Sequence, residues 1–124
     1  MTRERLDELR ELCAEDVRFR DPFNDFTGVE KLIEVFQDMY RQLEGPRFEV
    51  TDQAVGQNAC YLRWTMRFMR KGKAWEIEGL SEIHFDGEGR VAAHLDHWDS
   101  GAQFYARLPL LGAAIRWIQR RLAV

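Results

Sequence analysis

Residues 58–86 alternate between apolar and polar side chains with a period of two, and this pattern constrains the fold more than any other feature. The alternation runs on both sides of a Lys71-Gly72 dipeptide, which is typical of a turn. One set of alternate positions is Leu62, Trp64, Met66, Phe68, Trp75, Ile77, Gly79, Ser81, Ile83 and Phe85. The other set is Arg63, Thr65, Arg67, Glu76, Glu78, Glu82 and His84. The pattern predicts a β-hairpin with one buried face and one solvated or subunit-facing face, on which the basic and acidic rows pair.

The remainder of the chain extends this hairpin into a mixed domain. Strands are expected near residues 47–55, 58–70, 73–86 and 90–99, and a shorter strand over 17–21 that Pro22 stops. An amphipathic helix is predicted over residues 3–14. A second helix follows the loop 24–28, begins at a Thr27-x-x-Glu30 capping box and ends at Gly45-Pro46. The fold class is therefore α+β, with helices packed on one face of a curved antiparallel sheet.

The C-terminal part, residues 100–124, is predicted as a helical extension of a single domain that spans residues 1–124. Ser100-x-x-Gln103 is a second capping box, and apolar residues recur at helical spacing up to Leu122. The role of residues 109–124 stays open. They form either a helix packed on the domain or on a twin subunit, or a helix that binds a membrane surface or a partner.

Composition excludes several classes of function. The net charge of −3 argues against non-specific binding to nucleic acid. Cys13 and Cys60 match no metal or redox spacing, the histidines show no zinc-binding motif, and the glycines form no phosphate loop. No metal or organic cofactor is expected. The charged start and the lack of a long apolar run predict a cytoplasmic protein.

Four polar residues fall on strand faces that are expected to look inward: Asp21, Ser81, His94 and Asp96. Carboxylates and an imidazole in an apolar pocket are the groups that acid–base catalysis requires. Structural roles compete with this interpretation. Asp21 before Pro22 fits a turn, His94 fits a structural histidine, and Asp96 fits a partner of His94 or of an arginine. Apolar content alone leaves the inward face of residues 93–99 undecided.

The sequence resembles a known family over residues 1 to about 100. The segment Ala14–Phe23, with Asp21-Pro22 near its end and Thr27-Gly28 after it, is similar to the signature of ketosteroid-isomerase-like (SnoaL-like) domains of the nuclear-transport-factor-2-like superfamily. The alternating 79–85 segment, Gly89-Arg90-Val91 and the closing His97-Trp98-Asp99 are also similar to this family. The resemblance implies a cone-shaped domain whose curved sheet wraps its N-terminal helices around an apolar pocket.

The resemblance also implies roles for individual residues. Asp21 takes the position of the isomerase's base, and Ser81 the position of a group that donates to the oxyanion. His94, Asp96 and Trp98 then face the pocket, and Asp96 resembles a carboxylate that activates water in the epoxide-hydrolase branch. The expected pocket-shaping residues are Phe23, Phe36, Tyr40, Trp64, Met66, Trp75 and Trp98. Homodimerisation through the outer face of the sheet is the family habit.

Two departures argue against ketosteroid isomerase itself. A serine is a poorer donor to an oxyanion than a buried carboxylic acid. The chain is expected to begin at the family's second helix, without the first helix that carries an oxyanion tyrosine. Either the true start lies further upstream, or the last helix, predicted over residues 109–122, covers that side of the pocket. The sequence therefore predicts a pocket for a small, mostly apolar molecule, with isomerase or epoxide-hydrolase-type chemistry as its activity. The alternative is a non-catalytic binding or assembly module that acts through its dimer surface or C-terminal helix.

Overall fold

The computed structural model describes residues 3–103 and residue 120. The chain begins with the 3₁₀ helix η1 (Arg3–Glu8) and the helix α1 (Leu9–Leu12), followed by strands β1 (Cys13–Arg20) and β2 (Asp25–Thr27) and helix α2 (Val29–Gln42). Four strands follow: β3 (Glu44–Val55), β4 (Cys60–Arg70), β5 (Lys73–Phe85) and β6 (Val91–His97). The short helix α3 (Ser100–Gln103) comes after β6.

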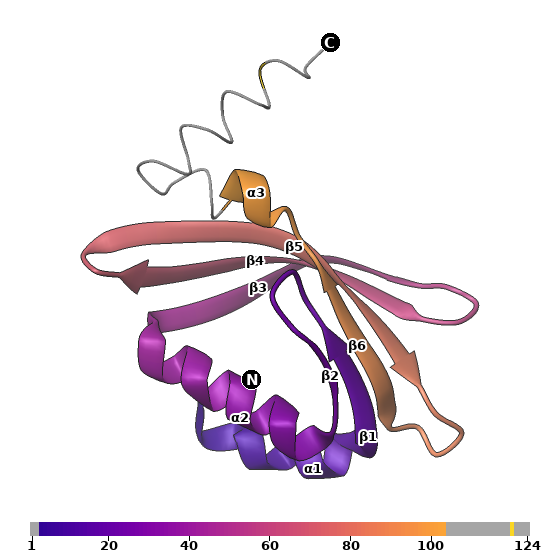
Figure 1. Cartoon of the computed structure of the whole chain (residues 1–124). Coiled ribbons are helices and arrows are strands. Elements are labelled where there is room, and N and C mark those ends of the chain that lie inside the picture. Colours follow the sequence, from indigo (N-terminus) through magenta and orange to yellow (C-terminus); the bar gives the residue numbers. More distant parts are fainter. Residues whose placement is uncertain (1–2, 104–119, 121–124) are drawn as a thin grey trace.

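The six strands form one sheet in the order β2-β1-β6-β5-β4-β3. The sheet curves around α1 and α2, which lie on its concave side (Figure 1). This arrangement confirms the predicted α+β class with a curved sheet wrapped around N-terminal helices. The predicted C-terminal helix of residues 109–122 lies outside the described residues.

The β4–β5 hairpin confirms the alternating pattern. Arg70 pairs with Lys73, so Lys71 and Gly72 alone form the connection. Both have positive φ, at 51° and 76°, which is the backbone geometry of a two-residue turn that matches the strand twist. Across the hairpin Arg67 donates to Glu76 at 3.1 Å and to Glu49 of β3 at 3.0 Å. The predicted pairing of opposite charges on the outer face therefore occurs at this position.

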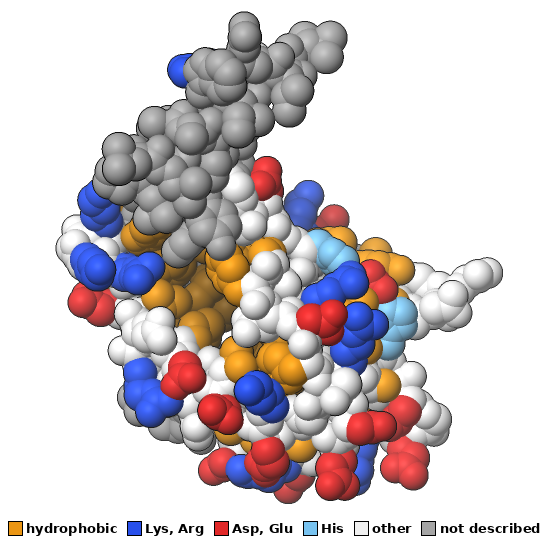
Figure 2. Space-filling view, viewed as in Figure 1, with side chains coloured by type: hydrophobic (Ala, Val, Ile, Leu, Met, Phe, Trp, Pro, Cys, Tyr) orange, Lys and Arg blue, Asp and Glu red, His pale blue; other side chains and the backbone are white. Residues whose placement is uncertain are grey.

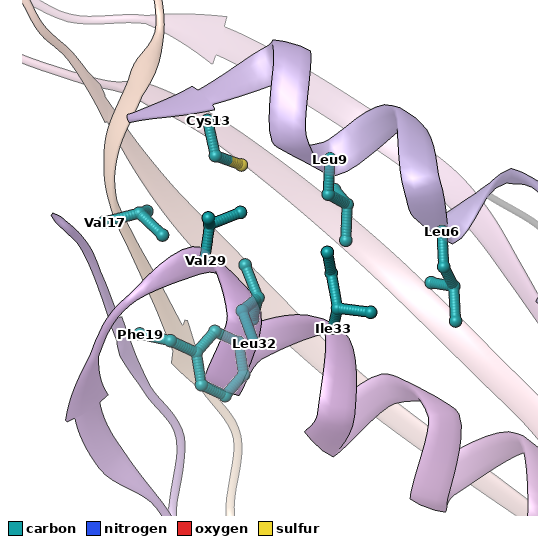
Figure 3. Packing of buried hydrophobic residues seen from close by; sticks show 8 residues of the cluster. All are labelled: Leu6, Leu9, Cys13, Val17, Phe19, Val29, Leu32 and Ile33. Carbon is teal, nitrogen blue, oxygen red and sulfur yellow. The ribbon is translucent and has the colours of Figure 1, made fainter. Parts of the chain in front are cut away.

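The closed end of the domain is a compact apolar cluster between α2, the N-terminal helices and β1. Val17, Phe19 and Leu32 are the most deeply buried of its side chains. Figure 3 shows them in one cluster with Leu6 and Leu9 of the N-terminal helices, which lie beside Ile33 of α2. Burial of apolar side chains is the main stabilising contribution in a domain of this length. The cluster fixes α2 against β1 and so sets the position of Asp21, the residue after this strand.

Several local predictions are wrong, each because a tertiary contact competes with the local signal. Residues 25–27 form strand β2, paired antiparallel with β1, where the sequence predicts a loop. The capping box at Thr27 does not form, since Gly28 is the N-cap without a side-chain cap. Glu30 instead accepts a 2.6 Å hydrogen bond from Arg10 of α1. The predicted helix over 3–14 is 3₁₀ for its first part and ends at Leu12.

One strand pair departs from the predicted antiparallel arrangement. β1 and β6 are parallel, with Phe19 beside His94 and Arg20 beside Leu95. The N-terminal segment thereby enters the sheet next to the last strand. This pairing brings the end of β1 and the end of β6 to the same side of the cone.

Candidate functional site

The concave face of the sheet and helix α2 enclose a cavity of about 570 Å³. Figure 2 shows a hollow whose visible surface is hydrophobic. The aromatic residues that line the cavity are Phe19, Phe23, Phe36, Phe48, Trp64, Phe68 and Trp98. The polar residues that line it are Asp21, Asn24, Asp38, Gln42, Arg70 and Asp96. A concave, mainly apolar cavity with a few polar groups is the usual form of a small-molecule site.

A connected polar cluster lies on the concave face of β4, β5 and β6. The indole Nε1–H of Trp64 donates to Ser81 Oγ at 2.8 Å, and Ser81 Oγ–H donates to Asp96 Oδ1 at 2.5 Å. His94 Nε2 lies 2.7 Å from the same Asp96 oxygen and 3.2 Å from Ser81 Oγ. Because a carboxylate only accepts, His94 carries its proton on Nε2 in this arrangement. The Asp96 side chain is 18% exposed, so the cluster holds a mostly buried carboxylate at the cavity wall.

A glycine makes room for the indole that starts this cluster. Gly79 pairs with Trp64 across the hairpin. A Cβ at position 79 would lie 2.5 Å and 2.6 Å from two ring atoms of Trp64, and 3.1 Å from the carbonyl oxygen of His97. Any other residue would therefore push the indole away from Ser81. Gly79 and Ser81 are two residues apart and therefore lie on the same face of β5. Gly79 leaves room for the Trp64 ring there, and Ser81 accepts the hydrogen bond from its N–H.

The second carboxylate, Asp21, follows the last residue of β1 directly. The parallel register places Arg20 next to Leu95, so the following residue of each strand is one of the two aspartates. Asp21 Oδ1 accepts hydrogen bonds from the backbone N–H of Phe23 at 2.8 Å and of Asn24 at 2.7 Å. The Asn24 amide also donates to it, at 3.1 Å. Asp21 thus closes the turn at Pro22, the structural role that the sequence offered, and it also lines the cavity.

The structure divides the expected pocket residues into two groups. Five of them line the cavity: Phe23, Phe36, Trp64, Met66 and Trp98. Tyr40 packs against the closed-end cluster, and Trp75 is buried and stacked on Phe68, so neither lines it. Ser81 and His94 lie behind Asp96 and do not line the cavity either. The hydroxyl proton of Ser81, expected to serve an oxyanion, is directed to Asp96.

Sequence reasoning missed several residues of the cavity. Phe48 contacts Trp64 edge-to-face, with ring centroids 5.7 Å apart. Phe48 and Val50 are alternate residues of the predicted strand, and this alternation could have identified Phe48 as a residue of the apolar face. Met39 lines the wall one turn after Phe36 on α2, and this helical spacing could have identified it. Asn24 was placed in a loop, and no sequence signal pointed to its contact with Asp21.

A second carboxylate–histidine cluster lies on the convex face. Glu82 Oε2 lies 2.6 Å from His84 Nε2, and Glu82 Oε1 lies 3.2 Å from His97 Nε2. The hydrogen bond from His84, and then that from His97, hold the pKa of Glu82 below its ordinary value. Elsewhere, burial raises the pKa of the Cys13 thiol.

The described residues contain neither a metal-binding group nor a membrane-spanning helix. Residues 3–103 hold no group of three or more His, Cys, Asp or Glu side chains arranged to bind a metal ion. Within the part of the chain that the structure covers, no helix has the length and apolar character needed to cross a membrane.

Comparisons with solved structures show the same fold in several bacterial proteins. An NTF2-like protein of unknown function from Exiguobacterium sp. 255-15 is 11% identical, with a TM-score of 0.71 over 80% of this chain and 86% of that one. An LEH-like epoxide hydrolase from M. tuberculosis is 15% identical, with a TM-score of 0.68 over 82% and 75%. A protein with a ketosteroid isomerase-like fold from Catenulispora acidiphila, in complex with trimethylamine, is 15% identical, with a TM-score of 0.72 over 84% and 83%. At these identities the likeness shows the fold alone.

Comparison with sequence families gives the assignment. No curated protein matches the sequence. The sequence model of the SnoaL-like domain matches residues 1–94, which include both helices of the closed end and all strands up to the first half of β6. The chain belongs to the SnoaL-like domain family.

Proposed function

We propose that the chain binds a small, mostly apolar molecule in this cavity and that Asp96 acts there as a proton acceptor. The observation that carries the proposal is the position of Asp96. It lines the cavity while Ser81 and His94 both hold its Oδ1 oxygen. A base needs a fixed position and a free lone pair that faces the substrate. Oδ2, the oxygen that those bonds leave to the ligand, fits this requirement.

The chemistry that such a base supports is proton transfer in a site walled off by aromatic rings. In an isomerisation, Asp96 takes a proton from the carbon next to a carbonyl group and returns it to another carbon. In an epoxide hydrolysis, Asp96 takes a proton from water while the water oxygen bonds to a ring carbon and the carbon–oxygen bond breaks. The ring oxygen then takes up a proton from solvent. In both, His94 and Ser81 are positioning residues, because they contact Asp96 and not the cavity.

Asp21 has a different role in this proposal. Its Oδ1 is already occupied by three N–H donors from Phe23 and Asn24. These hydrogen bonds hold the carboxylate of Asp21 in one orientation in the turn. We therefore assign Asp21 to binding and orientation of the ligand. The structurally related protein from Catenulispora acidiphila forms a complex with trimethylamine, a compact, methyl-rich molecule.

The test is turnover of a panel of small epoxides and β,γ-unsaturated ketones by the wild type and by Asp96→Asn. We expect Asp96→Asn to lower kcat/KM by about 100-fold or more, the usual contribution of a general base, without a change in thermal stability. Asp16→Asn, an exposed carboxylate on β1, is the matched control and should leave kcat/KM unchanged. Full activity of Asp96→Asn would show that Asp96 is not the proton acceptor.

The second candidate is a binding or assembly module that works through the outer face of the sheet. The observation in its favour is that Met69 and Leu80, on the convex face of β4 and β5, are 39% and 37% exposed. A homodimer through this face would cover them. Ligand binding without turnover of any substrate in the panel, by a wild type that forms dimers, would favour this candidate over the enzyme.

A further inference from the structure

We infer that the ligand of the cavity carries a positive charge on its apolar body and is a small alkylammonium compound. The inference rests on the proposed function, since it assumes that the cavity binds a ligand. It adds the charge and the shape of that ligand. Three features of the cavity carry it: the paired carboxylates, the absence of a nearby compensating cation among the described residues, and the aromatic walls.

The two carboxylates occupy neighbouring positions on parallel strands. Asp21 and Asp96 follow the paired residues Arg20 and Leu95, and both line the cavity. Neighbouring strands lie about 5 Å apart, so the two residues enter the cavity wall next to each other. A cation bound at this point would interact favourably with both carboxylates.

Among the described residues, little positive charge lies at this point. Elsewhere among the described residues, seven carboxylates form ion pairs with an arginine: Asp7, Glu8, Asp25, Glu30, Asp38, Glu49 and Glu76. Within the same residues, no lysine or arginine forms an ion pair with Asp21 or Asp96. Their partners are backbone and Asn24 amides, a hydroxyl, and His94.

Arg70, the cationic side chain that lines the cavity, stands far along β4 from this point. Asp96 pairs with Ser81, and Ser81 pairs with Leu62. Leu62 and Arg70 are eight positions apart on β4, which corresponds to about 26 Å of strand. Arg70 therefore lies near the far end of β4 from this point, and among the described residues it forms no ion pair with Asp21 or Asp96.

Aromatic rings follow the carboxylates on the same wall. Trp98 lies two residues after Asp96, and Phe23 two residues after Asp21. Both line the cavity, and their rings meet edge-to-face with centroids 5.4 Å apart. The faces of aromatic rings attract cations, tryptophan most strongly, and their carbon surface accommodates methyl groups. A neutral ligand would contact the rings without forming an ion pair with the carboxylates, whereas an anion would be repelled by them.

The test compares two probes of nearly equal size and shape by titration calorimetry with the full chain. Choline carries a trimethylammonium group, and 3,3-dimethyl-1-butanol carries an uncharged tert-butyl group in the same place. We expect choline to bind at least about tenfold more tightly, the difference that a cation gains from carboxylates and aromatic faces. Asp21→Asn and Asp96→Asn should each remove most of this preference, and Asp16→Asn should keep it.

The outcomes separate this inference from the proposed function. Equal or tighter binding of the neutral alcohol overturns the charge assignment and leaves an apolar pocket with its base intact. Failure of both probes to bind also overturns it, while turnover or binding of the epoxide and ketone panel then decides the proposed function separately. If the preference for choline remains in both aspartate variants, the cation binds elsewhere, and the assignment of its site to Asp21 and Asp96 is wrong.

Discussion

The two faces of the sheet carry similar residues in different surroundings. On the concave face, Asp96 is held by His94 and Ser81 beside the cavity. On the convex face, Glu82 lies between His84 and His97. Each cluster spans β5 and β6 and joins a carboxylate to imidazole, with one ring on the concave face and two on the convex face. Since adjacent residues of a strand point to opposite faces, Ser81 and Glu82 serve different clusters although they are neighbours in the chain.

The difference between the clusters lies in what surrounds them. The concave cluster continues into the buried indole of Trp64 and borders an aromatic cavity, so its hydrogen bonds work in a poorly hydrated space. The convex cluster is more exposed to water, so its ion pairs are more strongly screened. The same chemical groups therefore border an aromatic cavity on one face and lie nearer to solvent on the other.

The largest expected contrast between the faces is in apolar packing on β5. Ile77 is 5% exposed on the concave face, and Leu80 is 37% exposed on the convex face. Ile77→Ala should lower the free energy of unfolding by about 2–5 kcal/mol, because it removes buried carbon and leaves a void. Leu80→Ala should cost under about 0.5 kcal/mol, as for other surface positions. Urea unfolding measures both.

The same pair of variants also tests whether the convex face is a subunit interface. If Leu80→Ala costs as much as Ile77→Ala and the loss depends on protein concentration, the convex face is covered by a second copy. Equal losses that do not depend on concentration would contradict the division into a buried and a solvated face.

Gly79→Ala should have a smaller effect on the free energy of unfolding. This variant tests whether the small size of Gly79 holds the Trp64 indole in the concave cluster. The new methyl group would meet the Trp64 ring and force it to move, at a cost of about 1–3 kcal/mol typical of overpacking. Gly87→Ala is the control, because a Cβ there meets no atom within 4 Å. Urea unfolding and near-ultraviolet circular dichroism of the tryptophans should both change for Gly79→Ala only. An unchanged tryptophan signal would show that the indole does not depend on this close approach.

Sequence reasoning predicted the faces of the sheet well because alternation is a local property. The pattern over 58–86 correctly separated Trp64, Met66 and Ser81 from Arg67 and Glu76. Alternation says nothing about position along the cone, however. Trp75 lies on the correct face but near the hairpin end, where it packs on Phe68 and does not line the cavity.

Contacts between distant segments could not be predicted in the same way. The parallel pairing of β1 with β6, which brings Asp21 to Asp96, joins residues more than 70 positions apart and leaves no local pattern. Glu30 was expected to cap its own helix, but Arg10 from α1 offers a charged partner at 2.6 Å. Arg10 binds the Glu30 carboxylate at two points with opposite charge, so the tertiary contact prevails over the local cap.

The smallest effect on the free energy of unfolding is expected on the convex face, from substitution of Glu82, and this effect should depend on pH. Its pKa is lowered by the hydrogen bonds from His84 and His97, so its ionised form is favoured in the folded chain. This stabilisation is complete above the unfolded pKa of about 4.3 and is lost as the pH falls through the lower folded value. Glu82→Gln should therefore be slightly less stable than the wild type at pH 7, and the difference should vanish toward pH 3. Urea unfolding at pH 7, 5, 4 and 3 measures it, with the exposed Glu88→Gln as control. Because the cluster is open to water, added salt should shrink the difference at pH 7; a difference that salt leaves unchanged would mean that the convex cluster is as shielded as the concave one.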